Sequence, residues 1–421
     1  MGRTARDRRD LPHPKPVERI ELNEEHVGRR LLLTIVLLLI GAGALAYAVS
    51  QFFAPQSEWI AIEANASAGI TCAPEFEFLY HLGSGELSPT AERRAVTDAY
   101  TRLCRNAFLV FHNQMEAEGV NNLYAINRHP NEELAVDGAL YQALAAVERS
   151  GNRALYLGPV YDRYGSLFYC EDDSQLVDFD PRLSPEVARE YREYAAFAGD
   201  PRAVRVELLG EDRIRLFVSE EYLEYARREG VESFIDFAWM RNAFIADYLA
   251  RELTALGYTR GVLASCDGFI RCLDESGEEY SLLIYDRQQE KTCNVAVMCY
   301  QGPRSIVCLR DFPVNALEET RFYRLRSGEV RTPYVDTADG MCRNALSSLT
   351  CYAGDKGCGE ILLEMLPVYI AETLREGALE ELAAEGTDFV YCEDRVIRVS
   401  DPEAVFSQIY EEDGMQYTVA R

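Results

Sequence analysis

The sequence predicts an α+β fold, in which helices and strands are partly segregated along the chain. Apolar residues recur at helical spacing in some segments, and short runs rich in β-branched and aromatic residues occupy others. No internal repeat or low-complexity linker divides residues 55–421. A charge-free apolar run separates this long region from a short charged N-terminal segment. We therefore predict a single α+β domain over residues 55–421, behind an N-terminal transmembrane helix.

The first 54 residues are predicted to form a tail and an anchor. Residues 1–30 combine prolines and charges with too little apolar surface to fold, so we expect a disordered cytoplasmic tail. Leu31 to Ala54 carries no charge and is long enough for a membrane-spanning helix, which needs about 20 residues. Because Arg29 and Arg30 precede this run, the N-terminus is expected in the cytoplasm and the main domain on the outer side of the cell membrane. A cleaved signal peptide is the alternative, since Ala46-Tyr47-Ala48 resembles a small-x-small cleavage site.

Composition limits the classes of partner and of metal site. The chain has 69 Asp and Glu against 43 Lys and Arg, for a formal net charge of −26. Nucleic acid requires a basic face, so it is not expected as a partner. The twelve cysteines all follow the anchor and contain no CxxC pair, so a zinc ribbon is not indicated. Disulfides fit an oxidising compartment, whereas strand-like cysteines such as Cys293 and Cys299 also fit the role of small buried apolar residues.

Hydrophobic periodicity places the regular elements of the main domain. Helices are expected near 90–117, 138–149, 185–197, 238–256, 358–371 and 373–384. Strands are expected near 204–209, 213–218, 260–265, 280–285, 293–300, 304–309, 347–353, 388–392 and 395–399. Gly257 ends the fourth of these helices, and a strand over Val262 to Ala264 then leads to a turn at Asp267-Gly268. The last two strands are expected to form a hairpin that turns on acidic residues.

The segment that begins at Asp236 is the most informative part of the chain. It reads DFAWMRNAFIAD, followed by the rest of a helix, a strand and Asp267-Gly268-Phe269-Ile270. This order resembles the signature of the FAD:protein FMN transferase family, the ApbE-like flavin transferases: Asp-Leu-Gly-Gly-Ile-Ala-Lys-Gly-Tyr-Ala-x-Asp, a helix, a strand and Gly-Gly-Asn-Ile. Asp236 and Asp247 fall on its two Asp positions with the spacing intact. Asn242 falls on the Lys position, and Asp267 on the first Gly of the second motif.

Further motifs resemble the family in the same order along the chain. The run from Asn121 to Asn127 is similar to its Ser-x-Leu-x-x-Leu-Asn loop, with Asn127 on the Asn position. Leu157-Gly158-Pro159-Val160 is similar to its Val-Gly-Pro-Leu. Later, PYVDTADG resembles His-Ile-Ile-Asp-Pro-x-Thr-Gly, where Asp336 and Gly340 are retained and Pro333 stands in place of His.

A final motif completes the resemblance. Gly357 to Glu364 falls on Thr-x-Ala-Asp-Ala-Leu-x-Thr, which places Glu360 and Glu364 on the family's metal-binding Asp and Thr. The matches together extend from about Trp59 to about Asp401 and so cover most of the chain. The resemblance thus implies an ApbE-like fold for the main domain.

The resemblance also implies an activity and a site. The activity would be a magnesium-dependent transfer of FMN from FAD to a Thr or Ser hydroxyl of a partner, such as a membrane or surface redox protein. With the predicted anchor, the enzyme would be attached to the membrane. The acidic side chains of Asp236, Asp336, Glu360 and Glu364 are then expected to converge on one cleft. The implied roles are Asp336 as catalytic residue, Asp236, Asn242, Asn127, Asp267 and Gly340 around FAD, and Glu360 and Glu364 around Mg²⁺.

Departures from the family pattern keep alternatives open. Pro333 cannot carry a proton, Asn242 offers no positive charge, and Trp239 replaces a small Gly. Glu360 and Glu364 share a helix face and can grip a cation, or they simply form an exposed acidic face. A catalytically inactive flavin-binding or assembly module on the same fold is therefore the alternative function. A cysteine-bearing surface domain with an unrelated ligand is a third hypothesis.

Overall fold

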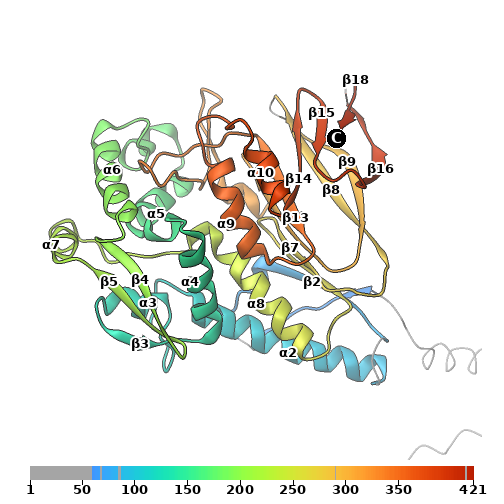
Figure 1. Ribbon diagram of the computed structural model, residues 1–421, viewed down its shortest axis with the longest axis horizontal. Helices are drawn as coiled ribbons and strands as arrows, with labels where there is room; N and C mark the ends of the chain where they lie inside the picture. Colours follow the sequence, from blue (N-terminus) through green and yellow to red (C-terminus); the bar gives the residue numbers. More distant parts are fainter. Residues whose placement is uncertain (1–58, 67–68, 84–86, 290, 413–414) are drawn as a thin grey trace, which may run out of the picture. The chain divides into compact units, whose positions relative to one another are not determined.

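The computed structural model describes residues 59–66, 69–83, 87–289, 291–412 and 415–421 (Figure 1). Contacts separate the chain into two units, Met1–Pro55 and Gln56–Arg421, and every described residue belongs to the second. The predicted tail over 1–30 and the predicted anchor over 31–54 lie outside the described residues. Within the described ranges, no helix is both long and apolar enough to cross a membrane.

A nine-stranded sheet forms the centre of the described unit. Its neighbouring strands pair antiparallel, except for the last pair, β15 and β19, which is parallel. In spatial order the strands are β1 (Trp59–Ala61), β2 (Phe76–His81), β6 (Gly261–Ser265), β7 (Phe269–Cys272), β10 (Arg304–Arg310), β13 (Ser348–Ala353), β14 (Asp388–Glu393), β15 (Val396–Val399) and β19 (Thr418–Ala420).

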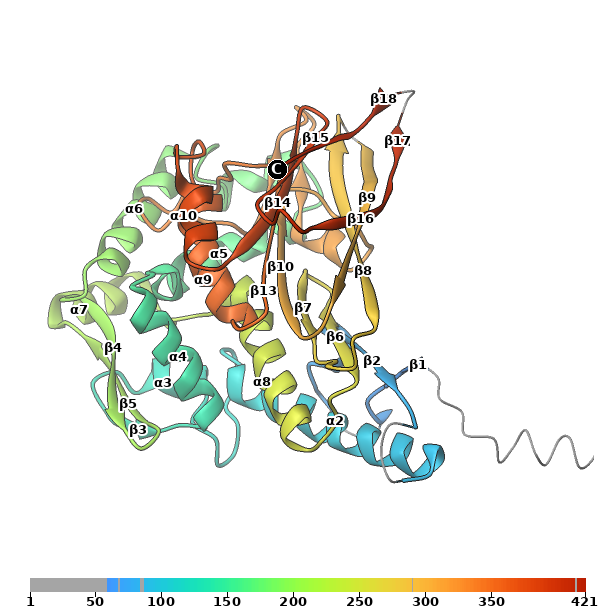
Figure 2. The ribbon, with the colours of Figure 1, turned by 45° about the vertical axis from the view of Figure 1, so that its right-hand side comes forward.

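Both faces of this sheet are covered, which explains the nearly continuous apolar run of β10. Ile306 and Cys308 pack into one hydrophobic cluster, while Val307 and Leu309 pack into another, because successive side chains point to opposite faces. The first cluster includes residues of a second sheet, ordered β16-β9-β8, which lies across the main sheet from the helices (Figure 2). Its strands are β8 (Glu279–Gln288), β9 (Lys291–Gln301) and β16 (Val405–Ile409).

Helices cover the other face of the main sheet. The helix α8 contacts β6, β7, α2 and α9, and α9 contacts β10 and β13, so these two helices form the inner helical layer. Nine residues of α8 are buried, as its amphipathic pattern predicts. The helices on this face of the sheet are α2 (Pro89–Phe111), α4 (Gly138–Ser150), α8 (Arg241–Ala255), α9 (Cys358–Tyr369) and α10 (Ala378–Ala384).

A smaller sheet with its own helices lies beside these helices (Figure 1). Its strand order is β3-β5-β4, and all neighbours pair antiparallel. The strands are β3 (Glu133–Ala135), β4 (Val204–Gly210) and β5 (Arg213–Val218), and the neighbouring helices are α3 (Leu123–Arg128), α5 (Gly158–Tyr164), α6 (Pro185–Gly199) and α7 (Glu220–Glu229). Two short two-stranded ladders complete the described elements: β11 (Tyr323–Arg324) with β12 (Val330–Arg331), and β17 (Glu411–Glu412) with β18 (Met415–Gln416).

The predicted α+β class is confirmed, and each predicted helix and strand has a counterpart in the structure. The first helix is shorter than predicted and ends at Phe111, because the ring nitrogen Nδ1 of His112 accepts bonds from the backbone amides of Gln114 and Met115. The helices α3, α5 and α7 were not predicted. Six or seven residues are too few to show a helical period in α3 and α5, and α7 has only three buried residues to carry one. All twelve cysteines are free thiols, and nine of them are buried.

Candidate functional site

A cleft of about 650 Å³ opens beside the N-terminal end of α8, a size typical of small-molecule sites. Its walls come from segments far apart in the sequence, including the end of α2, the helix α5 and the loop before α8. The lining joins carboxylates, arginines and aromatic rings: Glu75, Asn113, Gln114, Tyr161, Asp162, Tyr164, Phe168, Tyr169, Asp236, Ala238, Trp239, Arg241, Cys266, Leu317, Thr320, Arg321 and Pro333 are among its members.

Asp236 lies in this cleft and is held by three hydrogen bonds. Its amide donates to the Leu155 carbonyl at 2.8 Å, its Oδ1 accepts from the Ala238 amide at 2.8 Å, and its Oδ2 accepts from the Asn113 side chain. The side chain is 7% exposed, and burial raises the pKa of this carboxyl to about 6. All three partners are neutral, so the charge of Asp236 is balanced by no direct ion pair.

Asn127, predicted to contact FAD, supports Asp236 from behind. Its Nδ2 donates to the Ile235 carbonyl at 2.9 Å, and its Oδ1 accepts from the amides of Phe234 and Ile235 at 2.8 and 3.0 Å. The side chain is buried and is absent from the cleft lining. Asn127 therefore clamps the backbone that presents Asp236, because three otherwise unsatisfied groups depend on it.

The loop between Asp236 and α8 keeps a conformation that favours glycine. Ala238, on the first Gly position of the resembled motif, has a φ of 46°, in the left-handed region that costs an L-residue free energy. Trp239, on the second Gly position, lines the cleft and packs edge-to-face on Tyr334 with ring centroids 4.9 Å apart. The space that two glycines would leave open is therefore occupied by a large aromatic side chain.

Asp162 supplies a second carboxylate to the cleft that sequence reasoning missed. It lies on α5, is exposed within the cleft, and makes no hydrogen bond or ion pair with any described residue. Loss of hydration, and then repulsion from Asp236 and Glu232, raises the pKa of this carboxyl to about 7. Asp162 follows the Leu-Gly-Pro-Val motif by only two residues, but no pattern in the sequence places it opposite Asp236.

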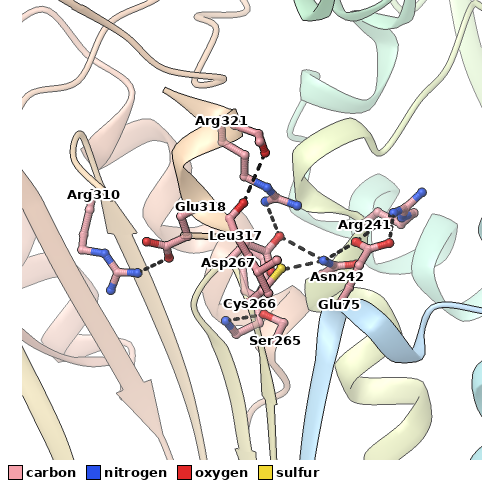
Figure 3. Close-up of polar contacts among 12 residues, drawn as sticks. Glu75, Arg241, Asn242, Ser265, Cys266, Asp267, Arg310, Leu317, Glu318 and Arg321 are labelled. Atoms are coloured by element: carbon pink, nitrogen blue, oxygen red, sulfur yellow. Dashed lines mark hydrogen bonds and ion pairs between the residues drawn. The ribbon is translucent and has the colours of Figure 1, made fainter. Parts of the chain in front are cut away.

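Both arginines of the cleft are already paired with acids (Figure 3). The Nη2 atom of Arg241 lies 2.7 and 3.0 Å from the two carboxylate oxygens of Glu75, and Arg321 forms an ion pair with Asp267. Asn242 joins the two pairs, because its Nδ2 lies 2.9 Å from Glu75 and 3.1 Å from Asp267. The predicted residues Asn242 and Asp267 are thus brought together. They belong to a network in which both arginines of the cleft are neutralised by carboxylates.

The predicted catalytic residue Asp336 lies outside the cleft lining. Its Oδ1 accepts from the Ala338 amide at 2.8 Å, and its Oδ2 forms an ion pair with Arg343 at 3.1 Å. Gly340 closes the same turn with a φ of 74°, and a Cβ atom there would lie 2.8 Å from the Cβ of Tyr191. The observed contacts of both residues hold this turn together.

The predicted metal ligands Glu360 and Glu364 are both on α9, and neither lines the cleft. Glu360 is exposed, whereas both oxygens of Glu364 bind the Lys356 ammonium at 2.7 and 2.8 Å. The Thr387 hydroxyl donates to Glu364 at 2.6 Å. Among the described residues, no three His, Cys, Asp or Glu side chains are grouped to hold a metal ion. Because an internal cation already occupies Glu364, this donor set does not fit magnesium.

The cleft does not fit the FAD diphosphate either. A diphosphate is held by unpaired cations, a metal ion, or free backbone amides at a helix N-terminus or in a glycine-rich loop. The described lining offers carboxylates and two arginines engaged with Glu75 and Asp267, and before α8 the Ala238 amide is already bound by the Asp236 carboxylate. Of the acidic groups expected to converge, Asp236 alone lines the cleft, while Asp336, Glu360 and Glu364 do not.

Comparison with known proteins identifies the fold. No protein-family model and no curated protein matches the chain. The ApbE protein from Thermotoga maritima is similar in structure, with a TM-score of 0.52 and 13% identity, over 84% of this chain and 97% of that one. The flavin transferase ApbE from Vibrio cholerae also matches, with a TM-score of 0.52 and 14% identity, over 80% of this chain and 94% of that one. The chain therefore has the fold of the ApbE flavin transferases.

Proposed function

We propose that this chain is a ligand-binding or assembly module on the flavin transferase fold and does not carry out magnesium-dependent flavin transfer. One observation carries the proposal: the side chains matched to the transfer chemistry are engaged by other parts of the protein. Glu364 is bound by Lys356, and Asp336 by Arg343. Pro333 lines the cleft at the position of the matched His and has no ionisable group.

Transfer of FMN to a Thr or Ser of a membrane or surface redox protein is the competing function. Its support is the shared fold, together with the position of Asp236 in a cleft of suitable size. One experiment separates the two functions. It combines titration calorimetry of the full-length chain with FAD, with and without MgCl₂, and a chromatographic assay for AMP release from FAD in the presence of a cell-membrane extract, whose proteins supply the Thr and Ser hydroxyls that would accept FMN.

We expect FAD to show no magnesium-dependent binding and no AMP to appear. The flavin transferase ApbE from Vibrio cholerae serves as positive control under the same conditions. Magnesium-dependent binding accompanied by AMP release would establish the transferase function and refute ours. Binding of FAD that ignores magnesium, without AMP, would identify the ligand of the module as a flavin nucleotide.

We also propose that residues 31–54 anchor the chain in the cell membrane, with the main domain outside. The support is the charge-free run that follows Arg29 and Arg30. Alkaline carbonate should leave the full-length chain in the membrane fraction, and external protease should digest the main domain in spheroplasts. A chain that lacks residues 31–54 is the control and should be extracted. Complete protection from external protease would contradict the proposed orientation.

A further inference from the structure

The cleft combines unpaired negative charge with aromatic walls, and this combination indicates the class of its ligand. We infer that the cleft binds a small organic cation, an ammonium group flanked by apolar atoms, between Asp162 and Asp236. This inference goes beyond the proposed function, which says only that the module binds a ligand. It also accounts for the misfit between this cleft and a diphosphate.

Asp162 and Asp236 form no ion pair with any described residue, although Arg241 is near enough to favour the charged form of Asp236. The lining carboxylates are Glu75, Asp162 and Asp236, and the lining cations are Arg241 and Arg321. Arg241 forms an ion pair with Glu75, and Arg321 forms an ion pair with Asp267, which does not line the cleft. Asp236 accepts hydrogen bonds from neutral donors only, and Asp162 has no partner among the described residues.

The two carboxylates also influence one another. Asp236 is the largest charged contributor to the raised pKa of Asp162, so the negative charges are close enough to repel. A cation placed between them would replace this repulsion with two attractions. The site does not suit a metal ion. A metal ion needs about six oxygen ligands, and no three candidate ligands are grouped among the described residues.

The aromatic side chains favour an organic cation over a metal ion. Tyr161, Tyr164, Phe168, Tyr169 and Trp239 all line the cleft, and the faces of such rings attract ammonium groups. Tyr169 is 84% exposed, so its ring is accessible to a ligand at the cleft.

Two buried polar groups in the same wall lack partners as well. The Tyr161 hydroxyl and the Trp239 indole N–H belong to side chains only 8% and 9% exposed. They approach one another without forming a hydrogen bond of good geometry. Buried polar atoms are rarely left unsatisfied, so this wall of the cleft holds two polar groups whose hydrogen-bonding capacity is not fully used by the described residues.

Tryptophan fluorescence provides a direct assay. The chain has two tryptophans, so Trp59→Phe leaves Trp239 as the single reporter in the cleft. The probes are choline and 3,3-dimethylbutan-1-ol, which have nearly the same shape and differ in charge. We expect choline to change the Trp239 emission in a saturable manner and to bind at least tenfold more tightly than the neutral alcohol.

A pair of variants tests the role of the carboxylates. Asp162→Asn should weaken choline binding about tenfold, whereas Glu360→Gln, which removes one charge outside the cleft, should leave it unchanged. Choline binding should tighten as pH rises from 5 to 8, as Asp162 and Asp236 ionise in the presence of Glu232 and Arg241. Equal affinity for choline and the alcohol, absence of choline binding, or an unchanged affinity in Asp162→Asn would overturn the inference. The FAD titration tests the proposed function separately, so each failure can be recognised.

Discussion

Two charged regions of this protein, both assembled from motif-like segments, treat their carboxylates in opposite ways. We call the first the α9 node; it consists of Asp247, Arg271, Ser305, Lys356, Glu364 and Thr387. There, Asp247 pairs with Arg271 at 3.1 Å and accepts from the amides of Cys358 and Gly359, both at 2.8 Å. In the cleft, Asp162 and Asp236 form no ion pair with any residue of the described ranges.

The contrast separates charge that stabilises the fold from charge that is available to a ligand. A carboxylate removed from water is costly unless cations or hydrogen bonds compensate for the lost hydration. The α9 node supplies that compensation through Arg271, Lys356 and two backbone amides, although burial still raises the pKa of Asp247. In the cleft, Asp236 is held by neutral donors alone, and its pKa and that of Asp162 are raised as well. Three substitutions test this contrast, and a fourth tests the backbone strain in the loop that follows Asp236.

Asp247→Ala should cause the largest loss of stability. It removes the acceptor of two amides at the N-terminus of α9 and leaves Arg271 without its carboxylate. We expect the free energy of unfolding to fall by about 3 kcal/mol in chemical denaturation. The control is Glu252→Ala, which lies on α8 as Asp247 does. It removes an exposed partner of Arg251 and should cost about 0.5 kcal/mol or less. Equal losses in both variants would show that the node is not structural.

Lys356→Met should be the next most damaging change. It leaves Glu364, whose side chain is 20% exposed, with the Thr387 hydroxyl as its remaining donor. We expect a loss of about 2 kcal/mol. Adding Glu364→Gln should recover part of it, with a coupling free energy of about 1 kcal/mol or more in a double-mutant cycle. Additive losses would mean that the ammonium and the carboxylate do not depend on one another.

Asp162→Asn should have a smaller effect of opposite sign. Because the pKa of Asp162 is raised to about 7, the folded state retains a proton that the unfolded state releases near pH 4. Raising the pH from 4 to 7 therefore destabilises the natural chain relative to the variant, and the difference stays constant above pH 7. Solvent screening limits the gain of the variant to about 1 kcal/mol or less. A stability difference that does not change with pH would contradict the raised pKa of Asp162.

Ala238→Gly should produce the smallest change, also a gain. Glycine adopts the φ of 46° without the clash of a Cβ atom, although it loses more entropy on folding. We expect a net gain of about 0.5 kcal/mol in thermal denaturation. The same substitution inside α4, Ala146→Gly, should instead cost about 1 kcal/mol. A loss at both positions would indicate that the loop is not strained.

Local patterns of the sequence were enough to predict most regular elements. The helix that ends at Gly257 and the turn at Gly268 follow from hydrophobic spacing and from glycine positions, and both glycines have positive φ. Short helices such as α3 and α5, and strands such as β2 and β7, were missed because too few residues carry the period. The predicted tail and anchor remain predictions, since they fall outside the described residues.

The candidate site was less accessible to sequence reasoning. Asp236 was placed in a cleft by its motif, and the cleft contains it. Glu75 and Asp162 were missed, because neither belongs to a matched motif and each gains its role from a residue far along the chain. The expectation that Asp336 and the α9 glutamates line the same cleft is not met.

The α+β character of this protein, the order of its motifs and the loss of an ionisable group at Pro333 can all be read from the amino-acid sequence. These properties depend on residue identity and on neighbours a few positions away. Which charges are neutralised depends on the folded chain: Lys356 pairs with Glu364, Arg321 pairs with Asp267, and Asp162 has no cation partner in the part of the chain that the structure describes. The reason is that the free energy of a charge depends on its distance to other charges and to water, and only the folded chain sets those distances.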